Sequence, residues 1–221
     1  LYGLSADWSC MHAREQFADK FNFTGGVSAD GRTYLWCTEK QGFTKENDEF
    51  TVFTSGYAAI KYTNVKADEN GMLPRNTYVD SERGFTFNWA GIGEVNGLPA
   101  QTQEFASSDF PIIRLADVYL MAAECSLRGA GEKEKGREYV NYLRSRAGVD
   151  AWVKDQFTLD NLLDERSREL YWENVRRTDL IRFNKFTGSS YTWAWKNNMR
   201  NGGAIPEYMN LIPLPSDVVA T

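Results

Sequence analysis

The sequence predicts a mainly α-helical protein whose first half is a large irregular region. Apolar residues recur at helical spacing between residues 111 and 186. Residues 1–110 are instead rich in Gly, Asn, Asp, Ser and Thr and contain only short apolar runs. At 221 residues the chain can bury a sizeable core. We therefore divide it into a loop-rich region, residues 1–110, which we expect to bind ligand, and a helical region, residues 111–221.

The loop-rich region is expected to contain a few short strands and one or two short helices. Its apolar runs, such as residues 33–37 and 50–53, are separated by turn-forming sequences such as residues 29–31, Ala-Asp-Gly. Residues 14–21 are its best candidate for a helix.

The helical region should begin with a hairpin of two helices. The first helix carries an apolar stripe of Leu115, Val118, Ala122 and Cys125. Gly129 follows it as a stop signal, and a second helix over residues 136–147 is closed by Gly148. The short linker between them predicts antiparallel packing.

A third helix is expected to begin after Thr158, which is a favourable N-cap residue. On one stripe of this helix lie Leu159, Leu162, Leu163, Arg166 and Leu170. Residues 187–221 are rich in Gly and Asn, and their three prolines forbid a long helix.

Several classes of function find no support in the sequence. The net charge is −5, and no basic cluster is longer than two adjacent arginines, which argues against nucleic-acid binding. His12 is the only histidine, and no GxSxG motif accompanies it. No P-loop, dinucleotide fingerprint, EF-hand or zinc spacing is present, so we expect neither a cofactor nor a metal.

The three cysteines do not form a redox or zinc pattern. Cys125 lies on the apolar stripe of the first helix, so we expect a buried thiol. Cys10 and Cys37 can pair only if the protein is exported, and a pair is not our first expectation.

Three motifs follow one another from residue 109 onward. The first opens a helix and ends in alanine-glutamate, the second closes a helix with Arg-Ala-Gly, and the third is rich in charge. Their residues are Arg114, Leu115, Asp117, Val118, Tyr119, Leu120, Ala123 and Glu124; Asn141, Arg144, Arg146, Ala147 and Gly148; and Leu163, Glu165, Arg166, Arg168, Glu169, Leu170, Glu173, Arg176, Arg177, Asp179, Leu180 and Arg182. Together with residues 55–64 and 191–215, they resemble the C-terminal part of the SusD/RagB family, in its starch-type subgroup.

This resemblance implies a SusD-like fold with TPR-like helical hairpins and no catalytic activity. It implies a lipoprotein anchored in the outer membrane and facing outward, which captures glycan and delivers it to a SusC-like TonB-dependent transporter. The family's lipid-anchor cysteine and first TPR helices have no counterpart here. We therefore expect a fragment of a longer protein whose helices leave an apolar surface exposed.

The charged residues between Glu165 and Arg182 form a dense cluster. A glycosidase would pair two carboxylates across a cleft, but Glu165 and Glu169 share one helix face. Each also has an arginine three or four residues away, which favours ion pairs over a raised pKa. We therefore expect a structural network that clamps helix to loop, and no catalysis.

Aromatic residues make up 14% of the chain and carry the binding hypothesis. Aromatic rings offer flat apolar faces to sugar rings. Tyr2 and Trp8, in a Gly/Ser/Asp-rich loop, and Trp89 are the candidate ligand-binding residues. Tyr191, Trp193 and Trp195 alternate at strand spacing, and we expect packing for them rather than a platform.

Two further functions remain open beside glycan capture. A peptide-binding import lipoprotein of the RagB type would need a cleft with main-chain hydrogen-bonding groups and fewer aromatic plates. A TPR-like scaffold for protein contact would not need the long irregular region of residues 1–110.

Overall fold

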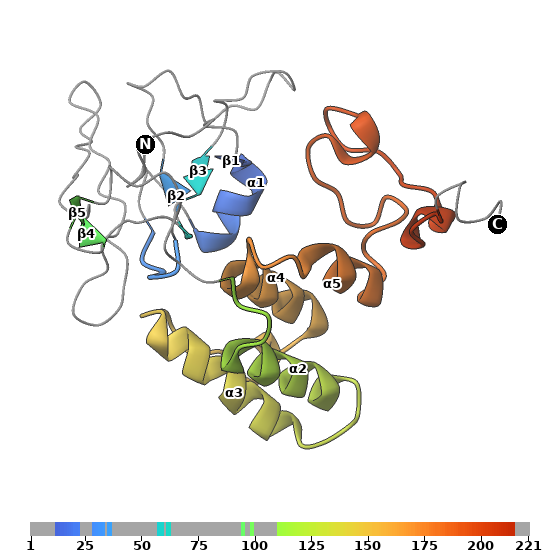
Figure 1. Ribbon diagram of the computed structural model, residues 1–221. Coiled ribbons are helices and arrows are strands. Elements are labelled where there is room, and N and C mark those ends of the chain that lie inside the picture. Colours follow the sequence, from blue (N-terminus) through green and yellow to red (C-terminus); the bar gives the residue numbers. More distant parts are fainter. Residues whose placement is uncertain are drawn as a thin grey trace. The chain divides into compact units, whose positions relative to one another are not determined.

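The computed structural model describes residues 12–22, 28–33, 35–36, 57–59, 61–62, 94–95, 98–99 and 110–214. It is mainly helical, which confirms the predicted fold class (Figure 1). The chain divides into two compact units, Leu1–Glu173 and Asn174–Thr221. The predicted functional division after residue 110 stays a prediction.

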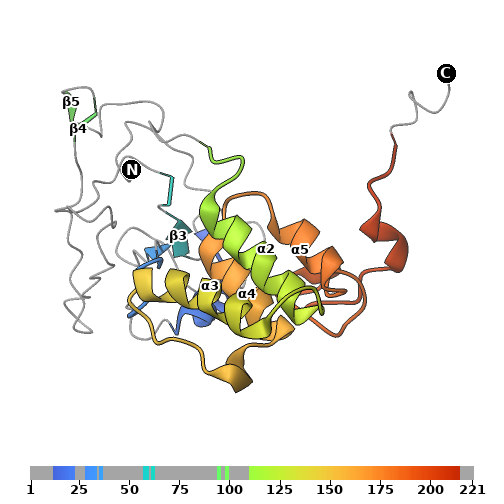
Figure 2. The ribbon, with the colours of Figure 1, turned by 90° about the horizontal axis from the view of Figure 1, so that it is seen from below.

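Three helices dominate the first unit, and they lie side by side (Figure 2). They are α2, Leu115–Leu127, α3, Lys133–Arg146, and α4, Leu159–Leu170, with the 3-10 turn η4, Lys154–Gln156, before α4. Helix α2 packs against both α3 and α4, and the predicted α2–α3 hairpin is confirmed. The chain leaves both hairpin helices through glycines with positive φ, Gly129 (96°) and Gly148 (72°), as the sequence predicted.

The hairpin closes around Gly136. A Cβ atom at this position would lie 1.9 Å from Oγ of Ser126 and 3.1 Å from the ring of Phe157. Glycine is therefore required for the close approach of α3 to α2. Leu120 and Ala123 of α2 and Val140 of α3 are fully buried.

Helix α2 buries a different face from the predicted one. Its buried apolar residues are Ala116, Leu120 and Ala123, whereas Leu115 (61% exposed), Val118 and the thiol of Cys125 lie at the surface. The prediction of a buried Cys125 is therefore wrong. Helix α2 is apolar around much of its circumference, so apolar spacing alone does not determine which face is buried.

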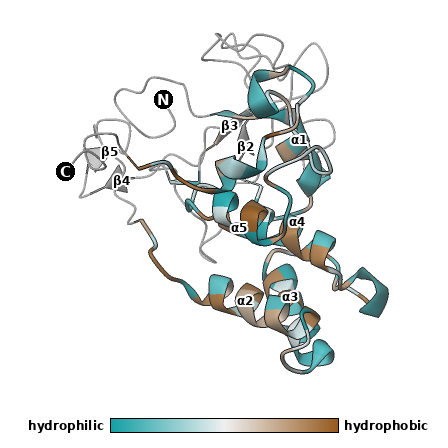
Figure 3. Ribbon diagram, turned by 90° about the vertical axis from the view of Figure 1, so that its right-hand side faces the viewer, coloured by the Kyte–Doolittle hydropathy of each residue, from teal (hydrophilic) through white to brown (hydrophobic). Residues whose placement is uncertain are grey.

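The exposed face of α2 continues into the segment before it, where Phe110, Ile112 and Ile113 are exposed. Figure 3 shows this segment as a hydrophobic stretch leading into α2. The expectation of an exposed apolar surface is confirmed.

Helix α4 matches its predicted stripe. Leu162, Leu163, Arg166 and Leu170 are buried, and Leu159 is half-buried. The Thr158 side chain accepts a hydrogen bond from the backbone N–H of Asn161 at 3.3 Å, which confirms the predicted N-cap.

The described parts of the loop-rich region form short elements. The predicted helix consists of α1, Glu15–Ala18, and the 3-10 turn η1, Asp19–Phe21. An antiparallel sheet has the order β1-β3-β2, with β1, His12–Ala13, β2, Leu35–Trp36, and β3, Tyr57–Ala59. A separate antiparallel pair joins β4, Glu94–Val95, to β5, Leu98–Pro99.

A small aromatic core connects these elements to the end of α4. Tyr171 packs against Phe21 and Phe17, with ring centroids 5.9 and 5.1 Å away, and its hydroxyl donates to the carbonyl of Arg32 at 3.0 Å. Tyr57 of β3 is buried in the same cluster.

The second unit contains α5, Arg176–Arg182, and the 3-10 turns η5, Lys196–Asn198, and η6, Glu207–Asn210. A β-bridge pairs Gly188 with Ile205. Across the described ranges, no helix is both long and apolar enough to cross a membrane.

Candidate functional site

Three glutamates spaced four residues apart form a ladder along α4 and the turn after it. Glu165 and Glu169 share one face of α4, because side chains at i and i+4 of a helix lie one above the other, and Glu173 lies in the turn after the helix. All three are buried, and Glu165 is fully inaccessible. Buried carboxylates need cationic partners, so the segments that supply these cations are held against α4.

Glu165 is paired with three arginines. Arg32 donates to Oε1 at 2.7 Å, while Arg144 of α3 and Arg168 of α4 donate to Oε2 at 2.9 and 2.5 Å. Arg32 lies 133 residues away in sequence, so this pair joins the loop-rich region to α4.

Glu169 also has three guanidinium partners. Arg114 and Arg146 donate to Oε1, both at 2.6 Å, and Arg32 donates to Oε2 at 3.2 Å. Burial alone would raise the pKa of Glu169, but Arg146, Arg32 and Arg114 outweigh it and lower the pKa to about 2.

Glu173 completes the ladder with Arg114 and Lys61. Arg114 binds it with two hydrogen bonds of 2.7 and 2.8 Å, and Lys61 forms a short ion pair with Oε1. Lys61 also donates to the carbonyls of Glu169 and Tyr171 at 3.0 and 2.9 Å. Its burial lowers the pKa of Lys61 to about 8 in spite of Glu173.

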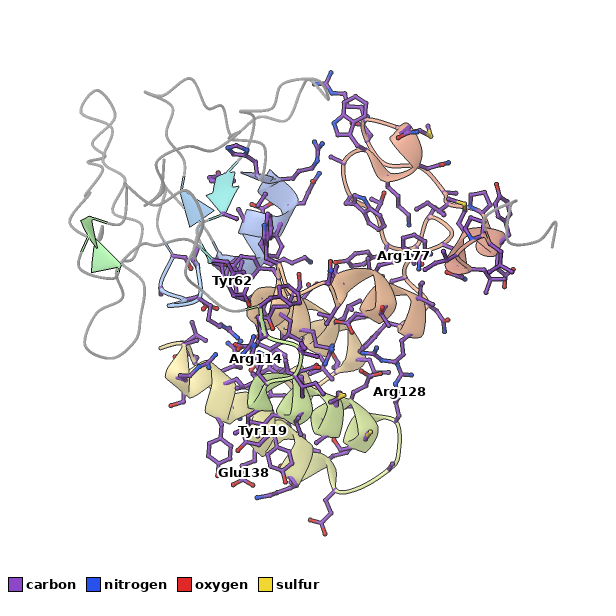
Figure 4. All side chains as sticks on the ribbon, viewed as in Figure 1. Tyr62, Arg114, Tyr119, Arg128, Glu138 and Arg177 are labelled. Atoms are coloured by element: carbon purple, nitrogen blue, oxygen red, sulfur yellow. The ribbon has the colours of Figure 1, made fainter. Side chains whose placement is uncertain are left out.

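The same contacts fix residues 28–33 on the helical layer. Asp30 holds the Arg32 guanidinium at 2.9 and 2.7 Å, and the N–H of Gly31 donates to the carbonyl of Ala147 at 2.8 Å. Figure 4 shows Arg114 and Tyr62 where the helices meet the N-terminal segments. The predicted clamp from helix to loop is confirmed for Glu165, Arg168, Glu169 and Glu173.

This arrangement does not suit general acid catalysis. A catalytic acid needs a raised pKa, whereas the arginines and Lys61 overcome burial and lower the pKa of Glu165, Glu169 and Glu173. The parts of the chain that the structure describes also contain no group of three His, Cys, Asp or Glu that could hold a metal ion.

The predicted ligand-binding residues cannot be placed. Tyr2, Trp8 and Trp89 lie outside the described residues, as do Cys10 and Cys37. Their assignments stay predictions.

The aromatic residues of the second unit pack together instead of lining a strand. Residues 191–195 form no strand, and Trp195 has a left-handed conformation with φ 68°. Trp193 stacks on Phe186 with ring centroids 6.4 Å apart, and Nζ of the buried Lys196 lies 4.8 Å from the centroid of the Trp193 ring. These contacts agree with the expected packing.

A cluster of three tyrosines on the α2–α3 hairpin was not singled out from the sequence. Tyr119 of α2 stacks on Tyr139 of α3, with centroids 5.1 Å apart and planes 10° apart. Tyr142 lies 6.2 Å from Tyr119 and is 53% exposed. The sequence signal for this cluster was the spacing of Tyr139 and Tyr142 on the highly charged α3, since residues at i and i+3 share a helix face.

Comparison with known proteins identifies the family. The model of the SusD family matches residues 8–212, nearly the whole chain. The chain belongs to the SusD family. The recognition made from residues 109–186 is thereby confirmed.

Two curated members of the SusD family are similar to this chain. Starch-binding protein SusD of Bacteroides thetaiotaomicron is 31% identical over 194 residues, covering 87% of this chain and 29% of that protein. SusD-like protein P25 of Formosa agariphila is 37% identical over 130 residues, covering 52% of this chain and 24% of that protein. The chain thus spans about a quarter to a third of the length of these relatives.

A solved structure has the same fold. Surface glycan-binding protein A from Bacteroides thetaiotaomicron, in complex with laminarihexaose, matches with a TM-score of 0.51 and 20% identity. The match covers 94% of this chain and 38% of that chain, and at this identity it shows the fold alone.

The family motifs are largely structural in this chain. Arg114, Arg144 and Arg146 bind the glutamate ladder, and Arg166 binds Asp117 at 2.9 Å. Asn141 binds both the N–H and the carbonyl of Trp152, at 2.7 and 3.1 Å. The motifs therefore report how the helices are fastened and do not identify a ligand.

Proposed function

We propose that this protein is a non-enzymatic glycan-binding protein of the cell surface. The main support for this proposal is the 31% identity to a starch-binding protein over 87% of the chain. The protein captures oligosaccharide or polysaccharide by stacking and hydrogen bonding, and no bond is cleaved.

The state of the α4 carboxylates supports capture without catalysis. Glycoside hydrolysis needs one carboxylic acid that keeps its proton near neutral pH. Glu165 and Glu169 are instead ionised, buried and saturated by arginines.

The ligand residues under this proposal are Tyr2, Trp8 and Trp89. Each stack should contribute on the order of 1 kcal/mol, by analogy with aromatic pairs. A few stacks together give binding in the range of about millimolar to tens of micromolar. The segments around Arg32 and Lys61, fixed by the glutamate ladder, would connect the loop-rich region to a rigid support.

The protein's partner under this proposal is a SusC-like TonB-dependent transporter, to which the glycan is passed for uptake. The protein is anchored to the outer membrane by lipid and faces outward. This placement follows from membership of the SusD family and is part of the proposal.

Calorimetric titration of the full-length, lipid-free protein tests the function. The ligands are α- and β-glucan oligosaccharides, fructans, host glycans and peptides. We expect one glycan class to bind, with weaker binding in Trp8→Ala or Trp89→Ala and unchanged binding in Tyr208→Ala, an exposed tyrosine of η6. Heat from peptides alone would move the protein to the peptide-import branch and remove these tryptophans from the site.

A further inference from the structure

The tyrosine cluster of the α2–α3 hairpin, defined as Tyr119, Tyr139 and Tyr142 with Lys135 and Glu138, has features that its role in packing does not explain. Figure 4 shows Tyr119 and Glu138 on the outer side of the hairpin, away from α4. Tyr119 and Tyr139 are half-buried, while Tyr142, Lys135 and Glu138 are exposed. The Tyr119–Tyr139 stack contributes to the contact of α2 with α3, whereas the Tyr142 ring beside it is 53% exposed.

The cluster combines flat rings with fixed polar groups. The Tyr142 hydroxyl donates to Oε1 of Glu138 at 2.9 Å, and Lys135 donates to Oε2 at 2.7 Å. Lys135 also lies 5.3 Å from the centroid of the Tyr139 ring. The hydrogen bonds from Lys135 and Tyr142 lower the pKa of Glu138, so the carboxylate stays ionised and accepts hydrogen bonds. The hydrogen bonds from Tyr142 and Lys135 to Glu138 place the ring, the carboxylate and the ammonium side by side on the surface of α3.

We propose that the tyrosine cluster is a second glycan-contact surface, separate from the loop-rich region. The ring of Tyr142, supported by the Tyr119–Tyr139 stack, contacts the apolar face of a sugar. Glu138 and Lys135 bond the hydroxyls at the rim of that sugar. The inference rests on the proposed glycan-binding function and adds a site to it.

The chemistry of the cluster favours a sugar over an apolar helix as occupant. A helix packed on Tyr142 would remove water from the Lys135–Glu138 pair without replacing its hydrogen bonds, which is costly. A sugar has an apolar C–H face for the ring and hydroxyls that both donate and accept. It therefore satisfies the ring and the ion pair together.

A second weak surface matters most for a long ligand. When one polysaccharide chain contacts two surfaces of one protein, the second contact is intramolecular and raises the apparent affinity. The surface should therefore contribute more to retention by polymer than to binding of a hexasaccharide.

Affinity electrophoresis of the full-length protein in gels containing soluble starch or laminarin tests the proposal. Tyr142→Ala should weaken retention by the bound polymer roughly three- to tenfold, the range expected for one lost aromatic contact. Tyr142→Phe, which keeps the ring, should stay close to the unmodified protein. Tyr208→Ala is the matched control, because Tyr208 is 72% exposed and lies outside the cluster.

Hydroxyl-radical footprinting with the same polymers gives a readout that does not depend on a substitution. We expect polymer to protect the peptide containing Tyr139 and Tyr142, and to leave the peptide containing Tyr208 unprotected. If the unmodified protein binds polymer but Tyr142→Ala retains full affinity and no protection occurs, the second surface is overturned while the proposed function stands. If the unmodified protein binds no glycan at all, both fall.

Discussion

Two runs of charged residues follow one another in this chain, Glu165–Glu173 and Arg176–Arg182, and they act over different distances. The first run is buried and binds Arg32, Lys61 and Arg114 from remote parts of the chain. In the second run, Arg182, whose side chain is 39% exposed, pairs at 2.7 Å with the buried Asp179 three residues away. Similar charge density therefore joins segments 133 to 137 residues apart through Arg32, whereas the contacts of Arg177 and Arg182 span 32 and 3 residues.

The difference follows from burial. An exposed pair is screened by water and contributes about 0–1 kcal/mol to stability. Breaking a buried pair leaves an uncompensated charge and costs about 3–5 kcal/mol. The first run therefore determines how residues 28–33 and Lys61 attach to α4, whereas in the second run water reaches the partly exposed Arg182 and weakens its pair with Asp179.

The largest expected effect separates the two runs directly. Arg32→Met leaves Asp30, Glu165 and Glu169 each short of a partner and should lower the free energy of unfolding by about 3–5 kcal/mol. Arg182→Met, the same replacement in the second run, should cost less, because the Arg182 side chain is 39% exposed and water screens its charge. Chemical denaturation of the full-length protein measures both. Similar losses in the two variants would remove the distinction.

The dependence of stability on pH tests the buried run separately. The pKa of Glu169 is lowered to about 2 in the folded protein. Its contribution to the free energy of unfolding is therefore fully present above the pKa that the same glutamate has in the unfolded chain, and it is lost as the pH falls towards 2. We expect stability to fall by on the order of 2–3 kcal/mol between about pH 5 and pH 2 because of this residue. Denaturation curves across this range measure the slope, and Glu169→Gln should make it shallower. An unchanged slope in that variant would show that Glu169 is not held in its ionised state.

The smallest of these effects concerns shape instead of charge. Gly136→Ala places a Cβ atom 1.9 Å from Oγ of Ser126 and should cost about 1–3 kcal/mol through overpacking. Thermal unfolding measures the loss. Adding Ser126→Gly should recover part of it, although glycine in α2 itself costs about 1 kcal/mol. An unchanged unfolding temperature in Gly136→Ala would show that α2 and α3 are packed less tightly than in the structure.

Local signals in the sequence predicted the helices well. Thr158 begins α4, and Gly129 and Gly148 follow α2 and α3, because caps and stops depend only on neighbouring residues. The buried face of α2 was predicted wrongly at Cys125, because apolar residues surround much of that helix and periodicity alone does not choose between its faces.

The remote partners of the three glutamates could not be predicted from local sequence pattern. The ion-pair character of Glu165 and Glu169 was predicted from nearby arginines, but Arg32 and Lys61 are more than 100 residues away from their partners. Nothing in their own neighbourhood distinguishes them from other surface cations. The tyrosine cluster was missed for the same reason, since Tyr119 meets Tyr139 only after α2 and α3 have packed.

A double-mutant cycle between Arg32 and Glu165 tests the central claim, that buried long-range charge fastens the loop-rich region to α4. The cycle combines Arg32→Met with Glu165→Leu in the full-length protein and compares unfolding free energies with those of an Arg182→Met and Asp179→Leu cycle. We predict a coupling above about 1.5 kcal/mol for Arg32–Glu165 and a smaller one for Arg182–Asp179, whose arginine is 39% exposed. Equal couplings, or none between Arg32 and Glu165, would contradict the account.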